Sequence, residues 1–340
     1  MKRLLAVLLA LVLVFGLVAC GNGGAQAPTP PAGGGGGTAP PQPPAAGVER
    51  FIFSTSNPGG VWYVLAGGIS ALWNQELGDR WALDSIASGG SVENTRRLAS
   101  GEADVTMTYT SHMYEAYHGT GILAGRPSPD GLLVFQIYEG NHAFVTLYED
   151  NIRTMSDLEG RSVVLGPPGS GTSDNSRRTL AALGITVQEQ EMSFADGARA
   201  LQDGIIEALG LSGHPSPGVV ELANVRNIWI IPFTEEEIAT VGAAEPHFRP
   251  GVLPVGIYDG VDVEVPVVDF SVWFAANRNV PEDAIYELMV AFFSDEGWEF
   301  LRSIHVRFGD MYMGQAEADR VGLEFHPGAL RFFDANPQFR

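Results

Sequence analysis

A glycine-rich turn with two hydroxyl side chains is the segment of this chain best suited to hold an anion. The turn, Gly166–Thr172, follows an apolar run at 162–165 and precedes a predicted helix at 175–183. A helix N-terminus after such a turn offers free backbone N–H groups and the positive end of the helix dipole. Ser170 and Thr172 add hydroxyl donors there. The turn predicts an anion site, and its other interpretation is an ordinary connection between strand and helix.

The same turn has part of the spacing of a nucleotide-phosphate loop, Gly166-x4-Gly171. Thr172 stands where that motif requires a lysine, so a triphosphate would lack its main charge partner. A small carboxylate is the better ligand. We predict that Ser170 and Thr172 hold it at a helix starting near Ser173, in a cleft that is filled with solvent when open.

Three further strand-to-helix turns are rich in Gly, Ser and Thr, at 54–60, 88–94 and 108–111. In an open parallel sheet such turns gather at the carboxyl ends of the strands. We expect the Gly166–Thr172 turn to face these three turns from a second sheet. The facing edges, or rims, of the two sheets would then form a cleft, and hydrogen-bond donors from both rims would converge on one small ligand. We expect Ser91 to donate from the opposite rim and Tyr63 to close one side of the pocket.

Strand-like and helix-like segments alternate from residue 48 onward, which predicts an α/β architecture long enough for two lobes. The apolar residues of the C-terminal helices, such as Phe292, Phe293 and Trp298, predict core packing. The expected strands are 50–55, 81–87, 104–110, 132–138, 142–148, 162–165, 207–211 and 265–277, and the main expected helices are 61–76, 111–117, 175–183, 194–203 and 281–303.

The first residues are typical of an export signal that ends at a lipidated cysteine. Lys2 and Arg3 precede an apolar run, and Leu17–Cys20 matches a lipobox. The apolar stretch is marginal for a membrane span, so we predict a signal peptide over 1–19 rather than an uncleaved anchor. Cys20 is the only cysteine of the chain, which excludes an intrachain disulfide.

Residues 20–47 are nearly all Gly, Pro, Ala, Gln and Thr. Such a segment cannot bury enough apolar surface to offset its ordering entropy, so we expect a disordered tether after the lipid anchor. The mature protein would then lie on the periplasmic or extracytoplasmic face of a membrane.

The charge balance restricts the partners of the chain. It has 20 basic and 40 acidic residues, a net charge of −20. A field of this sign disfavours nucleic acid, and an anion site must be built locally from dipoles and donors. The seven histidines show no His-x-x-x-His spacing, so we predict neither a metal nor a cofactor.

Three groups of turn residues carry a family likeness: Ser54–Tyr63, then Ser88–Asn94 with Leu98–Asp104 behind it, and finally Gly166–Thr172 with Gly213–Pro215. In this order after a lipobox, they resemble the TAXI family of solute receptors of tripartite ATP-independent periplasmic (TRAP) transporters. The likeness covers most of the mature chain.

The resemblance implies a type II periplasmic-binding-protein fold, in which two α/β lobes enclose a ligand cleft. One lobe would hold 48–141 and 266–340, and the other 142–265. It also implies a ligand such as glutamate or 2-oxoglutarate, delivered to membrane TRAP permease subunits, and no catalytic residues. We expect a monomer.

The residues expected to contact the ligand come from these turns. The chain departs from the family pattern at 56–58, where Gly-Thr-Gly is usual, and at Tyr109 and Ser111, where Gln and Asp are common. Arg96 and Arg97 lie on the helix after the second turn, and we expect one or both to be solvated. The predicted ligand-binding residues are Ser56, Trp62, Tyr63, Ser91, Val92, Asn94, Tyr109, Thr110, Ser170, Gly171, Thr172 and His214.

Two other functions fit parts of the sequence. A serine hydrolase would use Ser170 or Ser91 as nucleophile, His214 as base and Asp174 as the acidic partner. No Gly-x-Ser-x-Gly elbow supports it, because Pro168 replaces the first glycine. A lipid-tethered sensor for a membrane kinase would use the same binding lobes.

Overall fold

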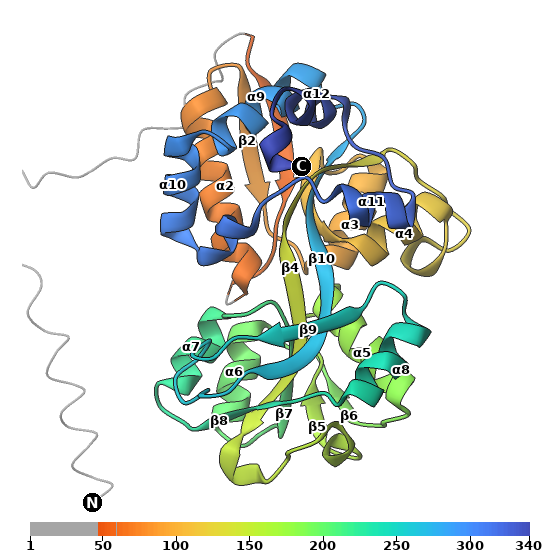
Figure 1. Cartoon of the computed structure of the whole chain (residues 1–340), viewed down its shortest axis with the longest axis vertical. Helices are drawn as coiled ribbons and strands as arrows, with labels where there is room; N and C mark the ends of the chain where they lie inside the picture. The colour runs from red at the N-terminus through yellow and green to blue at the C-terminus, as the bar shows by residue number, and fades with distance from the viewer. Residues whose placement is uncertain (1–46, 59) are drawn as a thin grey trace, which may run out of the picture. The chain divides into compact units, whose positions relative to one another are not determined.

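Two long strands join two α/β lobes. The structure is a computed structural model that describes residues 47–58 and 60–340, so Cys20, the predicted signal peptide and nearly all of the tether lie outside the described residues. Residues 45–340 form one compact unit. In this unit, β4 (Gly131–Leu147) and β10 (Val265–Asn277) pair antiparallel and run from one lobe into the other (Figure 1).

The strands form one ten-stranded sheet with the order β2-β1-β3-β10-β4-β7-β5-β6, while β8 pairs with β4 and β9 with β10. The prediction of a separate second sheet is wrong, because β4 and β10 carry pairing partners in both lobes. The other strands are β1 (Glu49–Ser54), β2 (Trp81–Ile86), β3 (Val105–Tyr109), β5 (Ser162–Val164), β6 (Gln188–Gln190), β7 (Ala208–Ser212), β8 (Ile228–Ile231) and β9 (Arg249–Leu253).

Helices cover both faces of the sheet in each lobe. Figure 1 shows α2 and α10 on one side of the first lobe and α3 and α4 on the other, with α6 and α7 opposite α5 and α8 in the second lobe. The helices are α2 (Val61–Leu77), α3 (Ser91–Ser100), α4 (Thr110–His118), α5 (Gly171–Leu183), α6 (Phe194–Gln202), α7 (Pro217–Ala223), α8 (Glu235–Ala244), α9 (Glu282–Phe292), α10 (Asp295–Ile304), α11 (Gln315–Val321) and α12 (Pro327–Ala335). Short 3-10 turns are η1 (Gly121–Leu123), η2 (Tyr148–Asp150), η3 (Met155–Leu158), η4 (Val306–Asp310) and η5 (Pro337–Phe339).

The predicted strands 132–138 and 142–148 are one strand, β4. The polar residues between them do not turn the chain. Gly140 instead lets the strand pack closely on β10, since a Cβ there would lie 2.4 Å from the Phe270 ring. The predicted lobe boundary at 141/142 falls inside β4, and that at 265/266 falls at the start of β10. Both boundaries stay predictions.

The long C-terminal helix predicted at 281–303 is two helices. The Ser294 side chain ends the first segment and accepts a hydrogen bond from Gly297 N at 3.0 Å, which caps α10. Pro281 is the N-cap of α9 rather than its first helical residue. The prediction that the aromatic residues here pack in the core is confirmed, because Phe292 and Phe293 are buried and Trp298 packs against them.

Candidate ligand-binding site

The four glycine-rich turns meet at one small cavity between the lobes. Its volume is about 20 Å³, and a water molecule needs about 10–15 Å³. It therefore has room for about one water. The lining residues are Ser56, Gly60, Val61, Trp62, Gly90, Ser91, Tyr109, Ser170, Gly171, Thr172, Phe194 and Ser212.

Three helix N-termini line this cavity, because α2 begins at Val61, α3 at Ser91 and α5 at Gly171. Neither α2 nor α3 has a side-chain hydrogen bond at its N-cap. The positive ends of these helix dipoles therefore lie beside the same cavity.

The Gly166 turn leads into a helix, as predicted, but this helix begins earlier than predicted. The helix α5 starts at Gly171, not near Ser173. The turn needs glycine at Gly166, whose φ is 130° and whose Cβ would lie 2.9 Å from Ser173 N. Ser170 is the N-cap, and its Oγ accepts a hydrogen bond from Ser173 N at 3.0 Å.

In this conformation Ser170 and Thr172 are buried, and the expectation that they face solvent when the cleft is open stays a prediction. Their exposed fractions are 4% and 2%. The rim of the other lobe covers them, since a Cβ at Gly90 would lie 3.4 Å from Ser170 Cα and one at Gly89 2.2 Å from Pro168 O.

A backbone hydrogen bond joins the two rims directly. Glu93 N, one of the first N–H groups of α3, donates to Gly169 O at 3.1 Å. The second and fourth turns thus touch along their backbones. Glycine is what permits this approach, because any side chain at Gly89 would meet the opposite carbonyl.

Tyr109 fills most of the space between the rims. Its ring lies 5.2 Å from Trp62 and 4.4 Å from Phe270 between centroids. Burial raises its pKa, and hydrogen bonds with Thr172 and Ser212 of the second lobe oppose this shift only in part. Tyr109 thus lies between the two lobes at the cavity that it lines.

Behind Tyr109, a hydrogen-bonded chain crosses from one lobe to the other. Ser91 Oγ lies 2.6 Å from His112 Nδ1, and His112 Nε2 lies 3.0 Å from Asp174 Oδ2. Although burial alone would raise the pKa of Asp174, its hydrogen bond to His112 and the charges of His112 and Arg178 lower it below the usual value. Asp174 is therefore the ionised end of the chain.

Arg178 extends this chain into an ion cluster between the lobes. Its guanidinium contacts Asp174 at 2.6 Å, Glu115 at 2.6 Å and Glu245 at 3.0 Å. Burial tends to lower its pKa, but the three carboxylates raise it above the usual value. Glu115 belongs to α4 in the first lobe, so the cluster contributes to lobe closure.

Ser91, His112 and Asp174 are connected like the serine, histidine and acid of a hydrolase triad. The histidine is His112 and not the predicted His214. Ser91 Oγ already accepts the Tyr109 N–H at 2.9 Å. The adjacent cavity has no room for a scissile carbonyl. The acid comes from the opposite lobe, so the arrangement exists only when the lobes are together.

His214 lies away from the cavity, at the back of the hinge. Its Nδ1 is 2.8 Å from Tyr258 Oη, and burial lowers its pKa to about 3. Arg307 donates to His214 O at 2.8 Å and to Asn141 Oδ1 at 2.5 Å, which ties the loop after β7 to β4. His214 therefore does not line the cavity, and a contact with the ligand stays a prediction.

Some of the other predicted residues line the cavity, and the rest do not. Ser56 and Trp62 line the cavity, whereas Tyr63 does not and is 51% exposed. Asn94 is buried, and its side chain bonds four groups of the surrounding turns. Thr110 accepts a hydrogen bond from Trp273 Nε1 at 2.9 Å, and Val92 is buried in α3 without lining the cavity.

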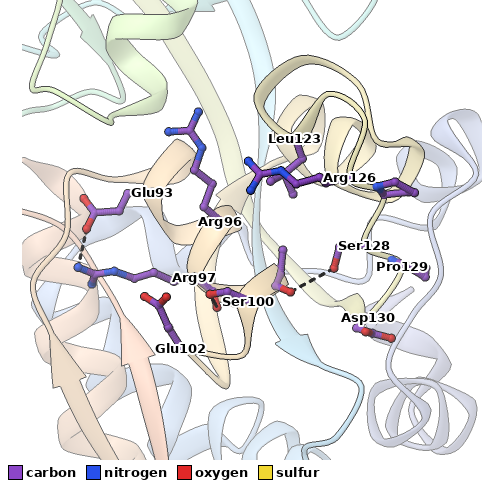
Figure 2. Close-up of a pocket in the computed structure, with 12 residues that line it drawn as sticks. Glu93, Arg96, Arg97, Ser100, Glu102, Leu123, Arg126, Ser128, Pro129 and Asp130 are labelled. Atoms are coloured by element: carbon purple, nitrogen blue, oxygen red, sulfur yellow. Dashed lines mark hydrogen bonds and ion pairs between the residues drawn. The ribbon is translucent and has the colours of Figure 1, made fainter.

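A much larger cavity, of about 650 Å³, lies on the outer side of the first lobe (Figure 2). Arg96 is exposed there, while Arg97 is half-buried and pairs with Glu93 at 2.5 Å. The exposure of Arg96 agrees with the prediction that one or both of these arginines are solvated. This groove contains both charge signs and lies among α3 and the 121–130 segment, so it lacks the convergent helix ends of the small cavity.

Within residues 47–58 and 60–340 no cluster of His, Cys, Asp and Glu could hold a metal ion. None of the helices described is long and apolar enough to span a membrane.

The model of the NMT1-like family matches residues 53–335. The chain belongs to the NMT1-like family. The matched span contains all four turns of the site and both strands that connect the lobes.

The chain is similar to solved structures of ligand-binding proteins, and its likeness to MatC supports the two-lobed fold. MatC from Rhodopseudomonas palustris with bound malate is 14% identical with a TM-score of 0.52, covering 85% of this chain and 97% of its own. The GluR0 ligand-binding core from Nostoc punctiforme with L-glutamate is 13% identical with a TM-score of 0.46, covering 74% and 97%. The alkanesulfonate-binding protein SsuA from Xanthomonas axonopodis pv. citri is 12% identical with a TM-score of 0.47, covering 87% and 96%.

Sequence reasoning about this family member missed several residues of the site. His112 gave a usable signal, because it lies in the first turn of the helix that follows Tyr109 and so faces the same rim. Ser212 directly precedes the predicted Gly213–Pro215 segment. Phe194 gave none, since only the folded structure brings the start of α6 to Gly60.

Proposed function

We propose that this protein is an extracytoplasmic solute-binding lipoprotein that captures a small carboxylate, similar to glutamate or 2-oxoglutarate. The convergence of the α2, α3 and α5 N-termini on one cavity is the observation that carries the proposal. Free N–H groups and helix dipoles stabilise a carboxylate without a basic side chain. The malate bound in the solved structure of MatC is compatible with such a ligand.

Ligand entry would require the lobes to move apart. The present cavity is far smaller than the roughly 300–1,000 Å³ typical of ligand sites. The strands β4 and β10 would act as the hinge, and closure would bring the four turns around the ligand. The contacts of Tyr109 with Thr172 and Ser212 would then be exchanged for contacts with the ligand.

The delivery partner we propose is a TRAP permease of the TAXI type. The lipobox at Leu17–Cys20 and the turn motifs support this subtype. Lipidation of Cys20 and a tether over 20–47 would hold the binding lobes near the membrane that carries the permease.

A thermal-shift screen tests the proposed ligand class. Amino acids, keto acids, dicarboxylates, sugars and cations are compared on the purified protein. A ligand that binds only the native state stabilises it by about 2.7 kcal/mol at a hundredfold excess over Kd. Small carboxylates should raise the melting temperature. Stabilisation by sugars or cations alone would overturn the anion site.

The Ser91–His112–Asp174 geometry makes a hydrolase the second candidate. Ester, amide and phosphate substrates are incubated with wild type, Ser91→Ala and Ser170→Ala. We expect no turnover. Hydrolysis that disappears specifically in Ser91→Ala would replace the binding function with an enzymatic one.

A further inference from the structure

One ion pair joins the two lobes at a place outside the ligand cavity. Figure 1 shows α4 of the first lobe on the same side of the molecule as α5 and α8 of the second. Glu115 on α4 pairs with Arg178 on α5, with 2.6 Å between Oε1 and Nη2. Neither side chain lines the cavity. The pair can therefore form without any contribution from a ligand.

Each partner of this pair is positioned by its own lobe. Glu115 Oε2 accepts a hydrogen bond from Ile122 N at 2.9 Å. Arg178 is held in the second lobe by Asp174 at 2.6 Å and by Glu245 at 3.0 Å. These three contacts lie within one lobe or the other, so separation of the lobes does not break them. Because both charged groups are already held in place, their pairing costs little side-chain entropy.

The pair is also shielded from water. The exposed fraction of the glutamate side chain is 8%, and that of the arginine side chain is 21%. Salt screens a shielded pair less than a surface pair, and breaking it leaves a partly buried charge without a partner. Two further contacts join the lobes here. The rings of Tyr114 and His247 lie 5.5 Å apart between centroids, and Arg320 donates to Pro246 O at 3.0 Å.

We propose that Glu115 and Arg178 form a latch that keeps the lobes closed before a ligand binds, so that release of this latch limits the rate of ligand exchange. The cavity of the closed conformation has room for about one water molecule and none for a carboxylate. Contacts of the chain itself therefore hold this conformation. The consequence for ligand exchange rests on the proposed function, whereas the closed resting state does not.

The latch would act on rates and not on recognition. A ligand enters only when the lobes are apart, so its association rate depends on how often the latch opens. The same pair would form again around a bound ligand, because it lies outside the cavity. Release of the ligand then requires the latch to open as well. A weaker latch should therefore speed both steps and leave the affinity nearly unchanged.

Small-angle scattering of the full chain without added ligand tests the closed resting state. Glu115→Gln removes the charge but keeps the shape of the side chain, so Ile122 N retains an acceptor. Its radius of gyration should exceed that of the wild type, because the open form becomes populated. Arg178→Lys should act in the same direction, since an ammonium group cannot contact three carboxylates as the planar guanidinium does.

Glu245→Gln is the matched control for the scattering comparison. It removes a carboxylate from the same guanidinium, but this contact lies within the second lobe. The control should stay as compact as the wild type. Wild-type compactness of both latch variants would overturn the latch, and so would an equal expansion of the control, which would assign the effect to the second lobe alone.

Stopped-flow tryptophan fluorescence measures ligand exchange, with glutamate and 2-oxoglutarate as probes, since Trp62 lines the cavity. In Glu115→Gln, association and dissociation should both become about tenfold faster or more, as expected for the loss of a shielded charge pair. The Kd should change by less than about threefold. A weaker affinity with an unchanged association rate would overturn the latch. If neither probe binds, the proposed ligand fails, and the scattering comparison still decides whether the lobes are latched.

Discussion

Gly171 lies at the first position of α5, with its Cα directed at the opposite lobe. A Cβ at this position would lie 2.2 Å from Tyr109 Cε2 and 2.9 Å from Ser91 Cβ. Its φ is not in the left-handed region, so the backbone itself accepts alanine. The glycine is therefore required by the contact between lobes and not by the local turn.

Gly171→Ala should leave each lobe folded but prevent complete closure. We expect ligand affinity to fall about tenfold or more, because closure completes the site. The radius of gyration in saturating ligand, measured by small-angle scattering, should exceed that of the wild type. Gly67→Ala in α2 is the control, since a Cβ there meets nothing within 4 Å. Wild-type affinity and compaction in Gly171→Ala would contradict the role of this contact.

At the scale of the element, α5 combines a structural cap with a binding role. Ser170 caps the helix through its hydrogen bond to Ser173 N. Ser193 caps α6 in the same way, accepting from Asp196 N at 3.1 Å, but it does not line the cavity. Substituting each serine therefore distinguishes the stability lost with a helix cap from the affinity lost with a ligand contact.

Ser170→Ala should destabilise the protein by about 1 kcal/mol through loss of the cap. Denaturant unfolding should show a similar loss in Ser193→Ala. Ligand affinity, by calorimetry, should fall only in Ser170→Ala. If both variants bind like the wild type, the ligand does not contact Ser170.

At the scale of the whole molecule, the hinge contains a buried acid. Asn141 on β4 donates to Asp269 Oδ1 on β10 at 2.7 Å. Burial raises the pKa of Asp269 from 3.8 to about 6, with this hydrogen bond and the charges of Arg249 and Arg307 opposing the shift. Between these two values the folded state binds more protons than the unfolded state, so this carboxyl lowers stability as pH rises.

Asp269→Asn should remove that loss, which is on the order of 3 kcal/mol between pH 4 and pH 7. The variant should gain stability over the wild type at pH 7 and little at pH 4, because the native carboxyl is already neutral there. Urea unfolding at both pH values gives the comparison, with the exposed Asp262→Asn as control. An equal difference at the two pH values would exclude the titration of Asp269 as its cause.

Much of this fold is encoded locally. The apolar run before Gly166, the hydroxyl residues after it and the αL glycine at Gly184 define a strand, a turn and a helix from the sequence alone. The helix start was misplaced by two residues or more, because the cap is a property of the backbone geometry at Ser170. The α/β alternation likewise follows from hydrophobic periodicity.

The sequence by itself determined the four turns, their order and the prediction of a local anion site in an acidic chain. The tertiary structure alone decided which residues meet across the lobes. Tyr109 on Gly171 and Ser91 with Asp174 are contacts between segments distant in the chain, and no local pattern encodes them.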